Sequence, residues 1–326
     1  MKEQACQKVD AAVQRLNDMR GLMAIWIVFG HLGISMSGKN GLFLMMEKLD
    51  LALVGMFFFL SGYGLEKSLK YKEGYLNSFI PKKAARLLLM TWVQFGVTEL
   101  CLYLVSFPRD YSGLTGVLRE YANNLNWYMW EIAVMYLIFF VSHILFKDGK
   151  AYFAAAVLTI GLTAAIYCFL GAYAACYSCL AFPAGMIFYS KRELIGRNEA
   201  SMFGSMFLLA MVLCCATGFS MVLPKESVIA VGGKNLFCVS FAFFTLVLFL
   251  RLDVKSKLLK FLSRISPEIY LYQFPAGSVL MALYCRGKGR PREYMYALLT
   301  FALTMAMALI MYALRRIFEK VIKNEN

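Results

Sequence analysis

The sequence predicts an all-α integral membrane protein, a polytopic bundle of about ten transmembrane helices. Two properties of the composition favour this fold: 60% of the 326 residues are hydrophobic and only 17% are charged, with a mean hydropathy of +0.60. A soluble domain of this length carries roughly a quarter charged residues. The apolar residues also come in long runs separated by short charged clusters, which is typical of helices of about 20 residues that cross a bilayer.

The apolar runs account for the predicted spans one by one. No stretch between them is long enough for a separate soluble domain, so we expect one membrane domain over residues 1–326, with 1–19 and 315–326 as cytoplasmic ends. The fifth and sixth spans are the least clearly divided, because only "LGAY" separates them. In chain order the predicted spans are 20–38, 49–66, 87–106, 127–146, 151–170, 172–190, 200–223, 227–250, 263–284 and 294–314.

The basic charge of the chain indicates its orientation in the membrane. The net charge is +14, and with the N-terminus inside, most Lys and Arg residues fall in segments on the cytoplasmic side. This asymmetry follows the positive-inside rule, so we expect a multi-pass plasma membrane protein with both termini cytoplasmic. We expect no nucleic-acid partner, because no motif for base stacking or groove reading accompanies the charge.

One segment expected outside, residues 285–294 ("CRGKGRPREY"), is also strongly basic. Either the number of spans differs by one from our assignment, or this loop meets an anionic partner outside the cell. At the other end of the chain, a polar stretch precedes the first span and no small-residue cleavage pattern follows that span. We therefore expect the first span to remain as a transmembrane helix rather than to be removed as a signal peptide.

The nine cysteines give no indication of a metal site. Most lie within predicted spans, where cysteine behaves as a small apolar residue. Cys176 and Cys179 form one CxxC motif, but neither a second pair nor a nearby histidine accompanies it. We therefore expect no metal cofactor.

The first span, "RGLMAIWIVFGHLGISMSG", carries Arg20 at its start and His31 near its middle. The two residues are 11 positions apart, so in a helix they share a face with an offset of about 20° and lie about 16 Å apart along the axis. Ionisable side chains inside a membrane are costly and usually functional. Each residue also has a structural explanation, since Arg20 can snorkel to the interface and His31 can be a packing residue.

The stretch "RLNDMRGLMAIWIVFGH" resembles the opening of the acyltransferase-3 family of integral membrane acyltransferases. Members begin with an arginine, ten intervening residues and a histidine inside the first span, and Arg20 and His31 match this spacing. The resemblance implies that these two residues are catalytic. Where members usually have an Asp three residues before the arginine, this chain has Asn17, with Asp18 beside it.

Two further motifs near the N-terminus carry the same resemblance. The segment 56–65, "MFFFLSGYGL", looks like the family's second-span signature, in which Ser-Gly lets backbones approach closely, and Ser61 and Tyr63 are candidate substrate or oxyanion contacts. The segment 79–89, "FIPKKAARLLL", is similar to the basic entry to the third span. Its cations are Lys82, Lys83 and Arg86. They either bind the phosphates of coenzyme A or form an ordinary anchor at the membrane interface. Arg20 is a fourth candidate for binding this donor.

The segment 262–275, "LSRISPEIYLYQFP", resembles a late motif of the family in its Ser266, Tyr270 and Pro275. Gln273 stands where a histidine is common. Glutamine can hydrogen-bond a substrate but cannot take a proton near neutral pH, so the mechanism has to work with one histidine. Tyr270 and Gln273 are therefore substrate or oxyanion candidates.

A weaker match lies in "NNLNWYMWEIAVMYL", residues 123–137, where members tend to show a Trp at the start of a span. Trp127 and Glu131 share a helix face there and are further substrate candidates. Glu131 falls within the membrane, either buried against a cation or lining a cavity. His143 follows near the inner end of the span, and we expect it at the interface.

The resemblance implies transfer of an acyl group, usually acetyl, from cytoplasmic acyl-CoA to a hydroxyl of an envelope glycan or lipid-linked sugar. Acetyl-CoA is then the expected co-substrate, and His31 acts either as a general base or through a covalent acyl-imidazole. Two other function classes stay open from the residues alone. One is a transporter or flippase of a polar or lipid-linked solute, although the two halves of the chain show no similarity to each other. The other is a non-catalytic relative.

Overall fold

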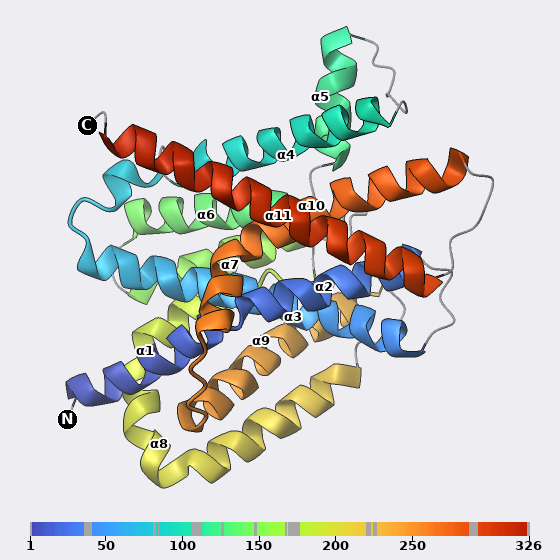
Figure 1. Cartoon of the computed structure of the whole chain (residues 1–326). Helices are drawn as coiled ribbons and strands as arrows, with labels where there is room; N and C mark the ends of the chain where they lie inside the picture. The colour runs from blue at the N-terminus through green and yellow to red at the C-terminus, as the bar shows by residue number, and fades with distance from the viewer. Residues whose placement is uncertain are drawn as a thin grey trace. The chain divides into compact units, whose positions relative to one another are not determined.

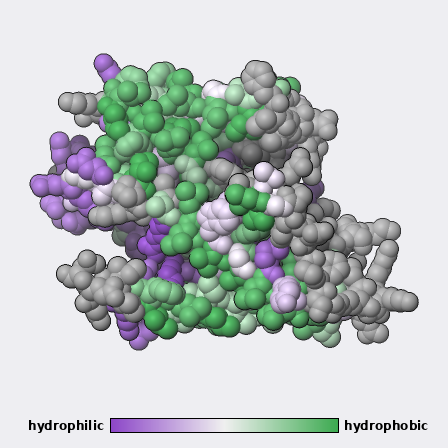
Figure 2. All heavy atoms as spheres, turned by 90° about the horizontal axis from the view of Figure 1, so that it is seen from above, coloured by the Kyte–Doolittle hydropathy of each residue, from purple (hydrophilic) through white to green (hydrophobic). Residues whose placement is uncertain are grey.

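The computed structural model describes residues 2–35, 41–80, 83, 85–105, 113–124, 127–146, 149–166, 168, 177–219, 223, 227–286 and 293–324. Over these residues every regular element is a helix and none is a β-strand, so the predicted all-α class is confirmed (Figure 1). The helices long and apolar enough to cross a membrane are Met45–Tyr71, Ala85–Leu104, Val228–Arg251 and Tyr294–Lys320. Shorter apolar helices are Arg20–Leu32, Glu131–Leu145, Gly149–Ala165 and Phe203–Gly218. Figure 2 shows hydrophobic residues over much of the face in view.

The helices group into two compact units that alternate along the chain. Unit 1 consists of Met1–Asn17, Leu49–Leu87 and Asn126–Lys255, and unit 2 of Asp18–Lys48, Leu88–Leu125 and Ser256–Asn326. A single membrane domain over the whole chain stays a prediction.

Unit 1 begins with a helix that hydropathy alone does not reveal, α1 (Lys2–Asp18). Its apolar positions Val9, Val13 and Leu16 recur at helical spacing and are buried, while the opposite face is polar. Arg15 near its end donates to the carbonyl oxygen of Phe249 at 2.8 Å. The polar N-terminal segment is therefore a helix packed onto the rest of unit 1.

The other helices of unit 1 are mostly those that the apolar runs predict. They are the main part of α3 (Gly41–Tyr71), α6 (Trp127–Leu145), α7 (Gly149–Ala165), α8 (Ala181–Gly218) and α9 (Val228–Arg251), with a short 3₁₀ turn, Leu76–Ser78, after α3. The helices α8 and α9 pack side by side along much of their length.

Helix α8 differs from the prediction, because one continuous helix covers most of the predicted spans 172–190 and 200–223. The polar stretch between these spans contains good helix formers, and Glu193 and Arg197 form an ion pair at i and i+4. Nothing there ends a helix in the way that proline does. Figure 1 shows α8 bending between its two halves instead of breaking.

Helices α3 and α8 cross at two glycines. A methyl group on Gly62 of α3 would overlap the carbonyl oxygen of Phe182, and one on Gly185 of α8 would overlap that of Phe59. Only residues without a side chain allow two helix backbones this close. The close approach expected of the Ser-Gly step at Ser61 is thus explained by Gly62.

Unit 2 is built around the pairing of α2 (Arg20–Ser35) with α10 (Lys257–Arg286). Gly21 lies against the backbone of Leu262, and ten residues further along α2, His31 meets Gln273. The contacts advance in the same direction on both helices, so α2 and α10 are parallel and in register. This pairing brings the first-span motif against the late motif.

Helix α11 (Glu293–Asn324) runs antiparallel to α10 within unit 2. The Arg315 guanidinium lies 2.9 Å from the carboxylate of Glu268, which is only 3% exposed, and Tyr296 donates to the carbonyl of Gly277. Two prolines, Pro267 and Pro275, lie inside α10. The contacts of Arg315 and Tyr296 hold α11 against α10, and the two helices pack along each other.

The remaining helices are α4 (Ala85–Leu104) and α5 (Gly113–Asn124). α5 is too short and polar to be recognised as a span, and it packs on the part of α4 that belongs to unit 2. The Tyr121 ring stacks on Trp92 with centroids 4.0 Å apart, and its hydroxyl lies 2.7 Å from that of Thr91. Aromatic stacking of this kind fixes a short helix that has little apolar surface of its own.

The crossing of α3 and α8 gives a first prediction. Gly62→Ala should lower the free energy of unfolding by about 1–3 kcal/mol, because the added methyl group forces the backbones apart. The matched control is Gly64→Ala, since a Cβ at Gly64 has open space around it. Thermal unfolding in detergent or nanodiscs measures both variants, and equal unfolding temperatures for the two would contradict the close crossing.

Candidate active site

The pair formed by His31 and Gln273 is the polar contact that joins α2 to α10. The Nδ1 atom of His31 lies 2.9 Å from Oε1 of Gln273, and the imidazole packs against the Phe274 ring with centroids 5.5 Å apart. Gln273 is buried, whereas His31 is half-buried. The other ring nitrogen, Nε2, has no hydrogen-bond partner among the described residues.

A stripe of polar residues on α10 leads to this pair. Ser266 and Tyr270 precede Gln273 by seven and three residues, so all three lie toward one side of the helix, and all are buried. Arg20 opens α2 directly before the Gly21 contact with Leu262. Arg20 and His31 therefore belong to one helix and one unit, in the arrangement that their spacing predicts, about three turns apart.

Ser61 and Tyr63 belong to unit 1, where Tyr63 has a defined partner. Its hydroxyl donates to the Asp10 carboxylate of α1 at 2.6 Å, and Lys67 lies 2.9 Å from the same carboxylate. The Tyr63 ring meets that of Tyr189 edge to face at 5.2 Å. The tyrosine thus ties α1 to α3, and a role toward substrate stays a prediction.

Part of the predicted basic cluster lines a small polar pocket after α3. Lys82 lies outside the described residues, whereas Lys83 and Arg86 are both exposed. The pocket has a volume of about 230 Å³ and is lined by Lys72, Glu73, Tyr75, Ser78, Phe79 and Lys83. Lys72 is a further cation here that the motif does not include.

The charge on Lys83 is affected by its surroundings. Lys83 as a whole is exposed, but its amino group is partly desolvated, and this desolvation lowers its pKa most. The like charges of Arg86 and Lys72 lower the pKa further. A pKa lowered by neighbouring cations indicates a locally positive potential. An anion bound in this pocket would relieve that repulsion.

Glu131 is buried within α6, only 5% exposed, as expected for a carboxyl group inside the membrane. The Cys179 thiol lies beside its carboxylate, and the hydroxyl of Thr163 lies 3.2 Å from that sulfur. Trp127 begins α6, but its side chain is outside the described residues, as is Cys176 of the CxxC motif. Among the residues that the structure describes, no group of three metal-ligating side chains is present.

His143 lies near the end of α6 with most of its side chain covered, and its place at the membrane interface stays a prediction. Its Nε2 atom lies 2.9 Å from Oε1 of Glu66, and their side chains are 9% and 4% exposed. Its Nδ1 atom lies 2.9 Å from the carbonyl oxygen of Phe139 in its own helix. The pair joins α3 to α6. The sequence does not identify this pair, because a Glu at the end of an apolar run is too common to indicate a buried partner.

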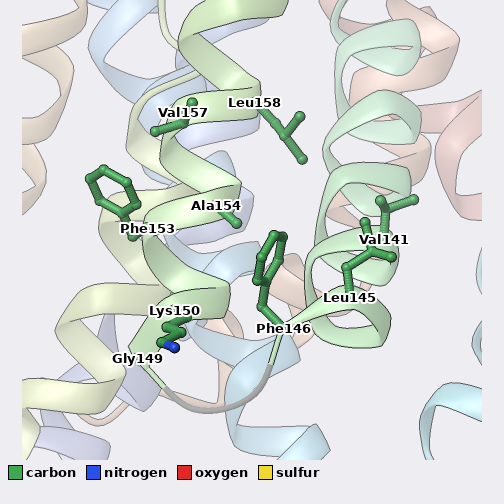
Figure 3. Close-up of a pocket in the computed structure, with 9 residues that line it drawn as sticks. All are labelled: Val141, Leu145, Phe146, Gly149, Lys150, Phe153, Ala154, Val157 and Leu158. Atoms are coloured by element: carbon green, nitrogen blue, oxygen red, sulfur yellow. The ribbon is translucent and has the colours of Figure 1, made fainter.

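An apolar groove of about 700 Å³ runs between α6 and α7. Figure 3 shows Phe146 and Leu158 reaching into the space between the helices, with the charged end of Lys150 near one end of it. All of the lining residues belong to unit 1, whereas His31 and Gln273 belong to unit 2. Among the described residues that line the groove, Lys150 is the one with a polar side chain.

Unit 2 therefore presents an imidazole that is held on one nitrogen and, among the described residues, has no hydrogen-bond partner on the other. Such a group can take a proton from a hydroxyl or attack a carbonyl carbon. The glutamine beside it can donate or accept a hydrogen bond but cannot exchange a proton near neutral pH.

A protein-family model described as an acyltransferase domain matches residues 13–316. The match extends from within α1 into α11 and includes Arg20, His31 and Gln273. No curated protein and no solved structure matches the chain.

The buried pair in unit 1 gives a second prediction. His143→Ala leaves the Glu66 carboxylate buried without its partner, which typically costs about 3–5 kcal/mol of stability. The double variant Glu66→Leu/His143→Leu should recover much of this loss, because well-packed apolar residues often replace a buried pair without cost. Thermal unfolding of both variants checks this, and a double variant no more stable than His143→Ala would contradict it.

Proposed function

The chain belongs to the acyltransferase-3 family, and from this premise we propose that it is an integral membrane O-acyltransferase that uses His31 as its general base. The observation that carries this proposal is the His31–Gln273 pair, in which one ring nitrogen is held within unit 2 and the other is free of described partners. A buried amide beside a half-buried imidazole positions that imidazole for proton transfer.

The proposed donor is acyl-CoA, with acetyl as the transferred group, and the proposed acceptor is a hydroxyl of an envelope glycan or lipid-linked sugar. We propose a plasma membrane location with ten spans and both termini in the cytoplasm. The apolar helices of the described residues are compatible with this topology, provided that the bent helix α8 supplies two crossings and that α10 supplies another.

In the proposed reaction, the free nitrogen of His31 takes the proton of the acceptor hydroxyl as its oxygen attacks the thioester carbonyl carbon. The new carbon–oxygen bond forms, the carbon–sulfur bond breaks, and the imidazolium returns its proton to the departing thiolate. No proton is gained or lost overall, so one histidine suffices. A positioned base of this kind typically supplies about 10²–10⁴-fold in rate.

The donor's phosphates are the proposed ligands of the cationic cluster after α3. Arginine forks and lysine ammonium groups bind phosphate oxygens well, and Lys72 and Arg86 both act electrostatically on Lys83. Lys72, which lines the same pocket as Lys83, is a further candidate for this role.

The roles that we propose for the other predicted site residues are less specific. Arg20, which lies in the same unit as His31, is the candidate for orienting the donor. Tyr63 already donates its hydroxyl proton to Asp10, so an oxyanion role for Tyr63 requires that bond to be exchanged. Ser61, Trp127, Glu131 and Tyr270 stay candidates for contacts with the acceptor or with the tetrahedral intermediate.

Replacing the base gives a third prediction. His31→Ala should lower acyl transfer by about 10²–10⁴-fold while leaving protein level and donor binding largely intact. Inverted membrane vesicles supplied with acetyl-CoA labelled in the acetyl group measure this as label that reaches lipid, glycan or water. Leu22→Ala, an exposed position on the same helix, is the control.

Full activity of His31→Ala would rule out this residue as the base. Consumption of acetyl-CoA without label in lipid or glycan would indicate hydrolysis in place of transfer to a sugar. If wild-type protein leaves acetyl-CoA and other acyl donors intact in the presence of added acceptors, a transporter or a non-catalytic relative becomes the better hypothesis.

The cationic pocket gives a fourth prediction. Lys72→Ala and Lys83→Ala should each weaken binding of coenzyme A by about tenfold, which corresponds to about 1.4 kcal/mol, and should reduce its salt dependence. Lys70→Ala, an exposed lysine in the last turn of α3, should leave the affinity unchanged. Titration of purified protein with coenzyme A measures all three, and equal affinities would show that the phosphates bind elsewhere.

A further inference from the structure

We infer that Gln273 is a positioning residue that holds the proton of His31 on Nδ1 and so makes Nε2 the basic nitrogen. The catalytic consequence of this inference rests on the proposed function, whereas the tautomer itself does not. The residue occupies the position where the resembling family commonly has a histidine. The inference therefore assigns a different task to this position in this chain.

The first step concerns which end of the Gln273 amide faces the imidazole. The Nε2 atom of Gln273 donates to the backbone carbonyl of Tyr270 at 2.9 Å. A carbonyl oxygen only accepts hydrogen bonds, so turning the amide around would set two oxygens against each other. The amide oxygen is therefore the end that faces His31, and the residue is held there because it is only 5% exposed.

This orientation of the Gln273 amide decides which nitrogen of His31 carries the hydrogen. An amide oxygen only accepts, so the 2.9 Å contact requires a hydrogen on Nδ1 of His31. In a neutral imidazole the other nitrogen then carries a lone pair. No described residue hydrogen-bonds that nitrogen, so it is free to accept a proton from a substrate.

The third step separates this role from a catalytic one. Gln273 has no proton to give near neutral pH, and both of its polar ends are occupied, one by Tyr270 and one by His31. It therefore acts through His31 rather than on the reacting atoms. The tertiary partner of a catalytic histidine commonly fixes the tautomer in this way, and losing it leaves the wrong nitrogen protonated for part of the time.

The test uses the tautomer as a readout that is independent of activity. The chain has two histidines, so protein labelled with ¹⁵N-histidine in nanodiscs gives a simple spectrum, in which the signals of His31 are those that His31→Ala removes. Protonated and unprotonated ring nitrogens have well-separated ¹⁵N shifts. We expect a protonated Nδ1 and an unprotonated Nε2 for His31 in the full-length protein.

Three variants complete the design. Gln273→Met, of similar length but unable to accept this bond, should mix the two tautomers and lower kcat by roughly 10²-fold with donor affinity unchanged. Gln273→Glu keeps an acceptor oxygen and should restore the Nδ1–H form and much of the activity. Gln94→Met makes the same chemical change at another buried glutamine of unit 2 and should leave the His31 signals unaltered.

The outcomes separate this inference from the proposed function. An Nε2–H tautomer in the wild type, or an unchanged Nδ1–H signal in Gln273→Met, would overturn the role of Gln273. If the wild type shows the Nδ1–H form and Gln273→Met loses it, but no acyl donor is consumed, then the positioning role stands and the acyltransferase proposal fails. Loss of kcat in Gln273→Met with recovery of much of the activity in Gln273→Glu supports both.

Discussion

A polar side chain inside a membrane has to find its hydrogen-bond partner within the protein, because lipid offers none. This constraint accounts for two contacts between helices. His31 of α2 meets Gln273 of α10, and Glu66 of α3 meets His143 of α6. Each contact joins helices that are far apart in the chain. The rare polar positions therefore specify which of many similar apolar helices become neighbours.

The sequence predicts most residues of the candidate site, but it does not predict how they come together. The spacing of Arg20 and His31 predicts their common face on one helix, and the late motif marks Gln273 as unusual. That these two motifs meet depends on the parallel pairing of α2 with α10, in which Gly21 lets the backbones approach. Since no periodicity reports on a contact between residues 242 positions apart, the partner of His31 could not be derived from the sequence.

The fold shows the same division between local and distant information. Apolar runs predict α4, α6 and α9 closely, because hydropathy reports directly on residues that face lipid, whereas α11 continues ten residues past its predicted end. Hydropathy misses α1 and α5, whose helices are polar on one side and are fixed by contacts such as Arg15 with Phe249 and Tyr121 with Trp92. It also divides α8 in two, since a polar stretch can continue a helix as well as end one.

The parallel pairing of α2 and α10 has a consequence for how the protein is made. The ribosome completes α2 early, and the codon for Gln273 follows that for His31 by 242 positions. At about 5–20 residues per second, this separation corresponds to roughly 12–48 s of translation. During that interval the nascent chain contains His31 but not its partner Gln273. A truncated product that ends before α10 contains His31 but not Gln273, so it cannot form this pair.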